Sequence, residues 1–224
     1  MTHLSQIRLL YDMPELSLRR PSYHRDPDSL SRLEVSKPGY DTCVLGKPRR
    51  FPDLNRVIRQ VMPDVIESWA KVRILKGGDT IHATSLLKRP EDKRDQTYVR
   101  YEAYVDIYRH QRRRKPKYEL QVFYGRLEHI FAFEFNTPAA RAALKLKSDT
   151  TIVLAAIRTC AITGSDHRLD IHYYSRHGEL SVIDIPGIQC AVGRVPDSAG
   201  GGWGIVDRSG SLARAIAVGD DEEH

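Results

Sequence analysis

Six cationic side chains within nine residues are the most concentrated chemical feature of the sequence. They lie in RHQRRRKPK, residues 109–117, and are Arg109, Arg112, Arg113, Arg114, Lys115 and Lys117. Exposed arginine and lysine contact phosphates and release counterions, so the run predicts salt-sensitive binding to DNA without readout of its sequence. Two other interpretations stay open: a nuclear import signal, for which RRRKPK has the usual composition, and a solvated loop that discourages aggregation of strand edges.

Aromatic side chains are the second candidate for binding. In TYVRYEAYVDIY, residues 97–108, Tyr98, Tyr104 and Tyr108 share the parity expected to face solvent, and Trp203 opens the last expected strand. Exposed rings of this kind stack on nucleobases or surround a methylated lysine. Rings on a sheet also stabilise it as ordinary cross-strand pairs, which is the alternative interpretation.

Histidine and aspartate side chains raise the question of metal chemistry. The segment DHRLDIHYYSRH offers a ligand set, but strand alternation explains its members as exposed side chains. A magnesium-dependent nuclease would need four widely spaced aspartates to converge. We predict no metal and no cofactor. The residues are Asp166, His167, Asp170, His172 and His177 for the ligand set, and Asp106, Asp170, Asp184 and Asp207 for the nuclease.

No covalent nucleophile is expected. KGGD and SAGGGWGIVDRSG match neither a Walker A loop nor a dinucleotide-binding loop, and Ser209 and Ser211 lie in no nucleophile elbow. The three cysteines, Cys43, Cys160 and Cys190, lack metal-binding spacing, which favours reduced thiols. Burial in apolar strands would raise the pKa of the last two. We therefore predict that the chain is not an enzyme.

The charge of the whole chain agrees with a polyanionic partner. The 224 residues carry a formal net charge of +6, and a positive field steers nucleic acid toward a protein. The N-terminus has no apolar signal region, and no apolar run is long enough to span a bilayer. We expect neither secretion nor membrane insertion.

Alternation of apolar and polar residues predicts the strands that position the basic run. Residues 97–108 form the clearest strand, and a second follows over 118–135, so the basic run lies at a hairpin tip. The second strand changes parity. Leu120, Val122 and Tyr124 lie on one face, whereas Leu127, Phe131, Phe133 and Phe135 lie on the other, so we predict a β-bulge near Gly125 or Arg126 that keeps both sets on one core.

The other segments predict a mainly β (α+β) fold. NTPAARAALKLK, residues 136–147, has a helix signature with Thr137 as N-cap and Pro138 at the first helical position. Residues 51–72 predict two short helical turns broken at Pro63. Further strands are expected in TTIVLAAIRTCAIT, LDIHYYSR, LSVIDI, GIQCAVGRV and GWGIVDR, separated by turns. The expected fold is a curled antiparallel sheet or small β-barrel with one short helix inserted and a partly helical N-terminal arm.

Composition divides the chain into three regions. Residues 1–50, interrupted by five prolines, are expected to form a weakly ordered arm. Residues 51–218 are expected to form a β-rich domain with a helical lead-in, and residues 219–224, GDDEEH, an acidic tail.

A series of blocks resembles a known group of proteins. The blocks VRYEAYVD, VFYGRLEHIFAFEF, TIVLAAIRTCAI, LDIHYYSRHGELSVIDIPGIQCAVGRV and WGIVDRSGSLARA, in this order over about residues 61–218, resemble the C-terminal accessory region of proteins encoded by CACTA-like DNA transposons of basidiomycete fungi. The resemblance implies a non-catalytic region separated from an upstream transposase domain, or a host gene derived from one. YGRLEHIF also resembles the small barrels of bromo-adjacent homology and Tudor chromatin modules, at the level of fold alone.

These observations lead to one hypothesis and two alternatives. The first is a nuclear, non-catalytic accessory domain that associates with DNA or chromatin through the basic hairpin tip. The alternatives are a protein-interaction β-barrel that tethers a transposase or another protein, and a residual magnesium-dependent nuclease or transposase fragment.

Overall fold

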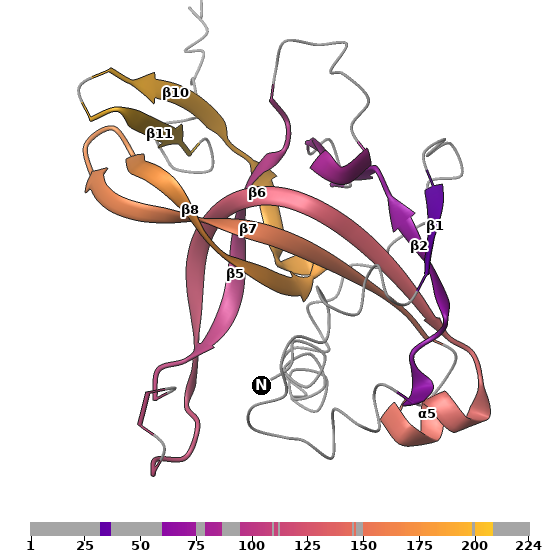
Figure 1. Ribbon diagram of the computed structural model, residues 1–224. Coiled ribbons are helices and arrows are strands. Elements are labelled where there is room, and N and C mark those ends of the chain that lie inside the picture. Colours follow the sequence, from indigo (N-terminus) through magenta and orange to yellow (C-terminus); the bar gives the residue numbers. More distant parts are fainter. Residues whose placement is uncertain are drawn as a thin grey trace, which may run out of the picture.

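The computed structural model describes residues 32–36, 60–74, 79–86, 95–108, 110–111, 113–144, 146, 150–198 and 200–207, with 32–36 as backbone alone. These residues are mainly β. As predicted, a curled antiparallel sheet forms a half-barrel, and one short helix is inserted in it (Figure 1). The expected acidic tail, 219–224, lies outside the described residues, as does most of the expected arm.

The large sheet has the strand order β1-β2-β6-β7-β8-β11-β10, while β5 pairs with β6 and β9, and β3 pairs with β4 in a separate ribbon. The strands are β1 (Arg32–Ser36), β2 (Val65–Trp69), β3 (Lys71–Arg73), β4 (Thr80–His82), β5 (Tyr98–Asp106), β6 (Tyr118–Phe135), β7 (Thr150–Asp166), β8 (Ile171–Asp184), β9 (Ile188–Ala191), β10 (Gly193–Asp197) and β11 (Gly202–Val206), and the helices are η1 (Thr84–Leu86), α5 (Pro138–Leu144) and η2 (Ile185–Gly187).

The sheet is apolar on both faces of its central strands. Leu154 and Ala156 of β7 belong to one buried cluster with Phe131, Phe133 and Phe135 of β6 and the apolar face of α5. Ala155 and Ile157 belong to a second cluster with β4, β5 and β9. All four β7 residues have 0% exposure. A continuous apolar run such as TIVLAAI is typical of a strand that is covered on both sides.

The predicted bulge is present, but it lies further along β6 and serves two cores instead of one. The register between β6 and β7 shifts between Leu127 and His129. Because of the shift, Leu127 before it and Ile130 after it share one cluster, whereas Phe131 belongs to the other. Leu120 and Val122 face no core, because 44% and 43% of these side chains are exposed. Gly125 serves close packing, since a Cβ there would lie 2.6 Å from Cγ2 of Ile157.

The helix prediction is confirmed. Oγ1 of Thr137 accepts a hydrogen bond from the amide of Ala140 (3.2 Å), which satisfies one of the unpaired donors of the first turn. Ala140 and Leu144 are buried and join the first core cluster. The helix therefore covers one face of the sheet at the end of β6 (Figure 1).

Two local predictions are wrong because strand pairing overrides the local signal. The helical turn expected after Pro63 is instead strand β2, which pairs with β1 and β6. The helical turn expected before it falls largely on residues 51–59, which lie outside the described residues. The strands expected over 169–176 and 180–185 are one strand, β8, and His177 lies within it opposite Cys160. Shifts of register along β7 and β8 absorb the irregular residues.

Candidate functional site

The basic run lies at a hairpin tip, as predicted. β5 and β6 pair antiparallel, from Tyr98 opposite Arg126 to Asp106 opposite Tyr118. The loop between them projects away from the half-barrel, at the lower left of Figure 1. Four predicted contact residues are described, and all four are exposed: Arg113, Arg114, Lys115 and Lys117. Arg109 and Arg112 lie outside the described residues.

The tip is folded by its own backbone contacts. The amide of Ile107 donates to the carbonyl of Lys117 (2.9 Å) and closes the neck of the loop. Beyond the neck, the amide of Gln111 donates to Tyr108 (2.7 Å), and the amide of Arg114 donates to Gln111 (3.0 Å). Arg114 therefore closes a turn that begins at Gln111, and Lys115 and Lys117 follow this turn toward β6.

The cations of the tip differ in their partners. Lys117 forms an ion pair with Glu119 (2.9 Å), and this hydrogen bond raises the pKa of the ammonium group. The guanidinium of Arg114 lies 4.8 Å from the ring centre of Tyr108. No described residue forms an ion pair with Arg113 or Lys115. A pair as exposed as Lys117 and Glu119 is weak in water, so it exchanges readily for a phosphate contact.

The predicted aromatic contacts have different environments. Tyr98 is buried (2% exposed), so the expectation that it faces solvent is wrong. Tyr104 and Tyr108 are half-buried on the hairpin, whereas Trp203 is 38% exposed. The cause for Tyr98 is tertiary: its face of the sheet is covered by residues of β8 and β10, which lie far away in the sequence.

Tyr98 and Trp203 do come together, but around a cation of the protein itself. The guanidinium of Arg194 lies 3.7 Å from the ring centre of Tyr98 and 4.4 Å from that of Trp203. It also donates to the hydroxyl of Tyr174 (3.1 Å) and forms an ion pair with Asp95. An aromatic cage is thus present, and its cation fixes β10 and β11 to β5.

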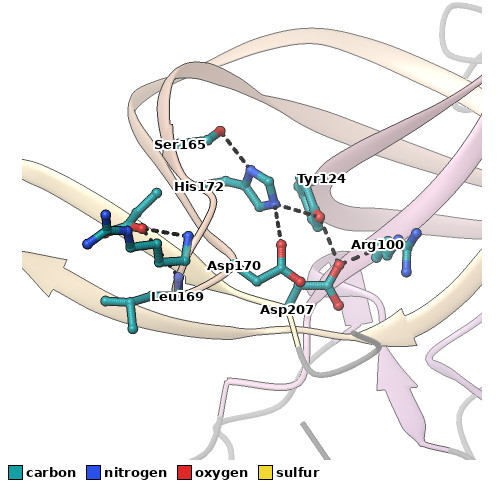
Figure 2. Close-up of polar contacts among 9 residues, drawn as sticks. Arg100, Tyr124, Ser165, Leu169, Asp170, His172 and Asp207 are labelled. Carbon is teal, nitrogen blue, oxygen red and sulfur yellow. Dashed lines mark hydrogen bonds and ion pairs between the residues drawn. The ribbon is translucent and has the colours of Figure 1, made fainter. Parts of the chain in front are cut away.

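A second polar cluster joins four elements near the turn between β7 and β8 (Figure 2). The hydroxyl of Tyr124 donates to Oδ2 of the buried Asp207 (2.8 Å), and Nε of Arg100 lies 3.5 Å from the same oxygen. Nε2 of His172 lies 2.9 Å from the tyrosine hydroxyl and 3.4 Å from Oδ1 of Asp170. Burial, followed by the Asp207 carboxylate, raises the pKa of Tyr124.

The direction of these hydrogen bonds follows from the single proton of Tyr124. Because that proton goes to Asp207, Nε2 of His172 must donate to the tyrosine oxygen, and with its hydrogen on Nε2 the ring accepts at Nδ1 from Ser165 (2.9 Å). A serine that donates to a histidine nitrogen is a nucleophile geometry. However, Oδ1 of Asp166 accepts from the nearby amides of Arg168 (2.8 Å) and Leu169 (3.3 Å), so neither is available to stabilise an oxyanion. The hydrogen bonds and ion pairs of the cluster join side chains of β5, β6, β7 and β8 to Asp207, the residue after β11.

Two of the four aspartates in the nuclease interpretation are neighbours, because the amide nitrogen of Asp207 lies 3.5 Å from the carbonyl oxygen of Asp170. In the part of the chain that the structure describes, no group of three or more histidine, cysteine or acidic side chains is placed to hold a metal ion. Asp106 lies at the tip end of β5, whereas Tyr124, the neighbour of Asp207, is opposite Arg100. Six residues of strand separate Asp106 from Arg100, which is about 20 Å. Asp184 lies at the end of β8, opposite Leu154 of β7.

The cysteine expectation is confirmed at Cys160. Cys160 is buried, and burial raises the pKa of this thiol to about 11. Cys190 is half-buried, and Cys43 lies outside the described residues. A thiol with so high a pKa is protonated at neutral pH and is a poor nucleophile.

Sequence reasoning missed the roles of Asp106 and Arg194. An aspartate at the end of a strand before a loop is a known turn signal, because its carboxylate accepts backbone amides two residues on, so Asp106 could have been found. Arg194 gave no local signal, since all its partners are distant in the sequence.

No protein-family model, no curated protein and no solved structure matches the chain significantly. Among the described residues, no helix has the length and apolar character needed to cross a membrane.

Proposed function

We propose that the chain is a non-catalytic accessory domain that associates with DNA or chromatin through the tip of the β5–β6 hairpin. The observation that carries the proposal is the group of exposed cations, Arg113, Arg114, Lys115 and Lys117, at the end of a projecting two-stranded ribbon. Cations on such a projection reach phosphates without desolvating the remainder of the surface.

The dimensions of the ribbon suit a groove of duplex DNA. Among the described strands, β5 pairs with β9 only as far as Tyr101, so β5 and β6 continue as a ribbon of two strands to Asp106. Five residues of strand extend about 17 Å. The major groove admits a two-stranded ribbon and is about 8.5 Å deep, so the tip has enough reach to enter it.

Two further parts of the proposal rest on the sequence. RRRKPK has the composition of an import signal, which supports a nuclear location. The order of the resembling blocks supports an origin in a fungal CACTA-like transposon, as the accessory region of a larger protein or a gene derived from it.

One observation favours protein interaction as a second candidate function. Leu120 and Val122 are exposed on the same ribbon face as the half-buried Tyr104, because Tyr104 is opposite Leu120 and Glu102 is opposite Val122. Exposed apolar side chains that lie together on a projecting element are typical of a contact with another protein, such as a transposase.

A DNA titration at several salt concentrations tests the leading function. We expect the wild-type protein to bind duplex DNA weakly and with little dependence on sequence, and its affinity to fall steeply between 50 and 200 mM salt. The triple variant Arg113→Ala, Arg114→Ala, Lys115→Ala should bind more weakly. The negative slope of log K against log salt should become shallower by about 0.9 for each phosphate that the variant no longer neutralises. The measurement is fluorescence anisotropy with a labelled duplex.

A matched control separates the tip from net charge. Arg73→Ala, Arg168→Ala, Arg176→Ala removes the same charge from exposed residues of β3, the β7–β8 turn and β8. This control is expected to retain most of the affinity and the slope. Equal losses in both triple variants would assign binding to net charge, and no binding by the wild type at 50 mM salt would refute the proposal. If proteins stay bound after nuclease treatment, and if their binding depends on Leu120 and Val122, the second candidate function is favoured.

A further inference from the structure

Asp106 is a carboxylate at the base of a cationic loop. It is the last residue of β5, lies opposite Tyr118, and is 7% exposed. If the loop binds a polyanion, this negative charge opposes binding, because like charges repel across a loop of this size. Any favourable effect of Asp106 on binding must therefore come from something other than its charge.

The contacts of Asp106 supply that contribution. Its Oδ1 accepts the amide of Tyr108, two residues further on (3.0 Å), and the amide of Lys117, at the far end of the loop (3.1 Å). One oxygen therefore joins the start of the loop to its end. The backbone bond from Ile107 to Lys117 (2.9 Å) lies beside it, so three hydrogen bonds between described residues close the neck of the loop.

We infer that Asp106 is the positioning residue of the interface, and the inference rests on the function proposed above. It orders the loop before DNA arrives, so that Arg113, Arg114 and Lys115 project from one set of turns, and it does not itself contact DNA. A loop that is already ordered loses less conformational entropy on binding, and this gain exceeds the unfavourable effect of one buried, hydrogen-bonded charge.

Two substitutions separate the two effects of Asp106. Asp106→Asn and Asp106→Ala both remove one negative charge, but only asparagine keeps a side-chain oxygen that accepts the two amides. From charge alone, both variants would bind DNA more tightly than the wild type. We expect Asp106→Asn to bind as tightly or more tightly, and Asp106→Ala to bind about fivefold more weakly, with an unchanged salt slope because every phosphate-binding cation is still present.

A neighbouring carboxylate provides the matched control. Glu119 lies on the same hairpin, is exposed, and forms an ion pair with Lys117. Unlike Asp106, it accepts no hydrogen bond from a backbone amide among the described residues. Glu119→Gln therefore removes a charge without loosening the loop, and it should bind DNA at least as tightly as the wild type. Affinity of Asp106→Ala equal to or above that of Asp106→Asn would overturn the inference.

A second measurement does not depend on DNA. Hydrogen exchange of the Tyr108 and Lys117 amides should be at least tenfold faster in Asp106→Ala than in Asp106→Asn, while exchange of core amides such as Leu154 stays unchanged. If Asp106→Ala unfolds, Asp106→Ser replaces it, and its exchange and affinity should lie between those of the other two. Protected amides in Asp106→Ala would refute the positioning role even if DNA binds. Absence of DNA binding by the wild type, with the expected exchange, would refute the proposed function and confirm the loop-ordering contact alone.

Discussion

At the scale of single residues, most charged side chains near the sheet centre are held by specific partners. Arg126 and Arg158 lie directly opposite each other on β6 and β7, an arrangement that like charges disfavour. Glu128, at the register shift, compensates: both Nε and Nη2 of Arg158 donate to it (3.1 and 3.0 Å), and Arg126 donates to it as well (3.1 Å). The bulge therefore also places an anion between two cations.

The free energy of unfolding at acidic pH should depend on this contact. Burial raises the pKa of Glu128, but the hydrogen bonds from Arg158 and Arg126 outweigh burial and lower the pKa from its usual 4.5. A lowered pKa in the folded state means that the stabilisation is complete above about pH 4.5 and is lost as the pH falls further. We expect Glu128→Gln to be less stable than the wild type by about 1 kcal/mol at pH 7, since both arginines are partly exposed.

Urea denaturation between pH 7 and pH 3 checks this prediction. The difference in unfolding free energy between wild type and Glu128→Gln should shrink below pH 4.5, because protonation removes from the wild type the charge that the variant already lacks. A difference that is equally large at pH 3 would show that the contact does not depend on ionisation.

At the scale of elements, the three-strand contact around Gly125 sets how closely β5, β6 and β7 approach. Gly125 is paired with Val99 on one side and Thr159 on the other. A Cβ at this residue would lie 2.6 Å from Cγ2 of Ile157 and 2.7 Å from the carbonyl oxygen of Arg158. Because the second atom belongs to the backbone, the sheet itself would have to move.

A pair of glycine substitutions tests this constraint. We expect Gly125→Ala to destabilise the protein by about 1–3 kcal/mol through overpacking. Gly164→Ala, on β7, is the control: a Cβ there meets nothing within 4 Å, so its stability should change by about 0.5 kcal/mol or less. Thermal and chemical denaturation give both values, and similar effects of the two substitutions would contradict the packing argument.

The same constraint affects the hairpin that carries the candidate interface. Beyond Tyr101 the ribbon has only two described strands, and an isolated two-stranded ribbon is marginally stable in water. Its rigidity therefore depends on the sheet around Gly125 at one end and on Asp106 at the other. The candidate site is stabilised from both ends of β5.

At the scale of the whole molecule, one sheet separates two apolar clusters. Leu154 contributes to the cluster that contains α5, and Ile157, three residues along β7, contributes to the cluster that contains β4 and β9. In a sheet with one wet face, residues of opposite parity would differ strongly in their contribution to stability. Here both are completely buried.

Alanine substitutions on β7 test whether both faces stabilise the fold. Leu154→Ala and Ile157→Ala should each cost about 2–5 kcal/mol, because each leaves a cavity in a packed core. Ile162→Ala, at a residue of the same strand that is 40% exposed, should cost about 1 kcal/mol or less. Equilibrium unfolding in denaturant measures all three, and a small cost at either buried residue would mean that the corresponding cluster contributes little.

The sequence by itself determined the features that depend on near neighbours. Alternation over residues 97–108 and 118–135 placed the basic run at a hairpin tip, and Thr137 with Pro138 placed the start of α5. Strand period, helix capping and turn formation act over a few residues, so a single sequence contains them.

Only the tertiary structure decided what lies on each side of those elements. Tyr98 carries the signal of a solvent-facing strand residue, yet Arg194 from β10 covers its ring. The segment after Pro63 becomes strand β2 because β1 and β6 offer it backbone partners. The physical reason is common to both. Burial, cation–π contact and sheet pairing depend on residues that approach only after the chain has folded, so a local sequence pattern does not predict them.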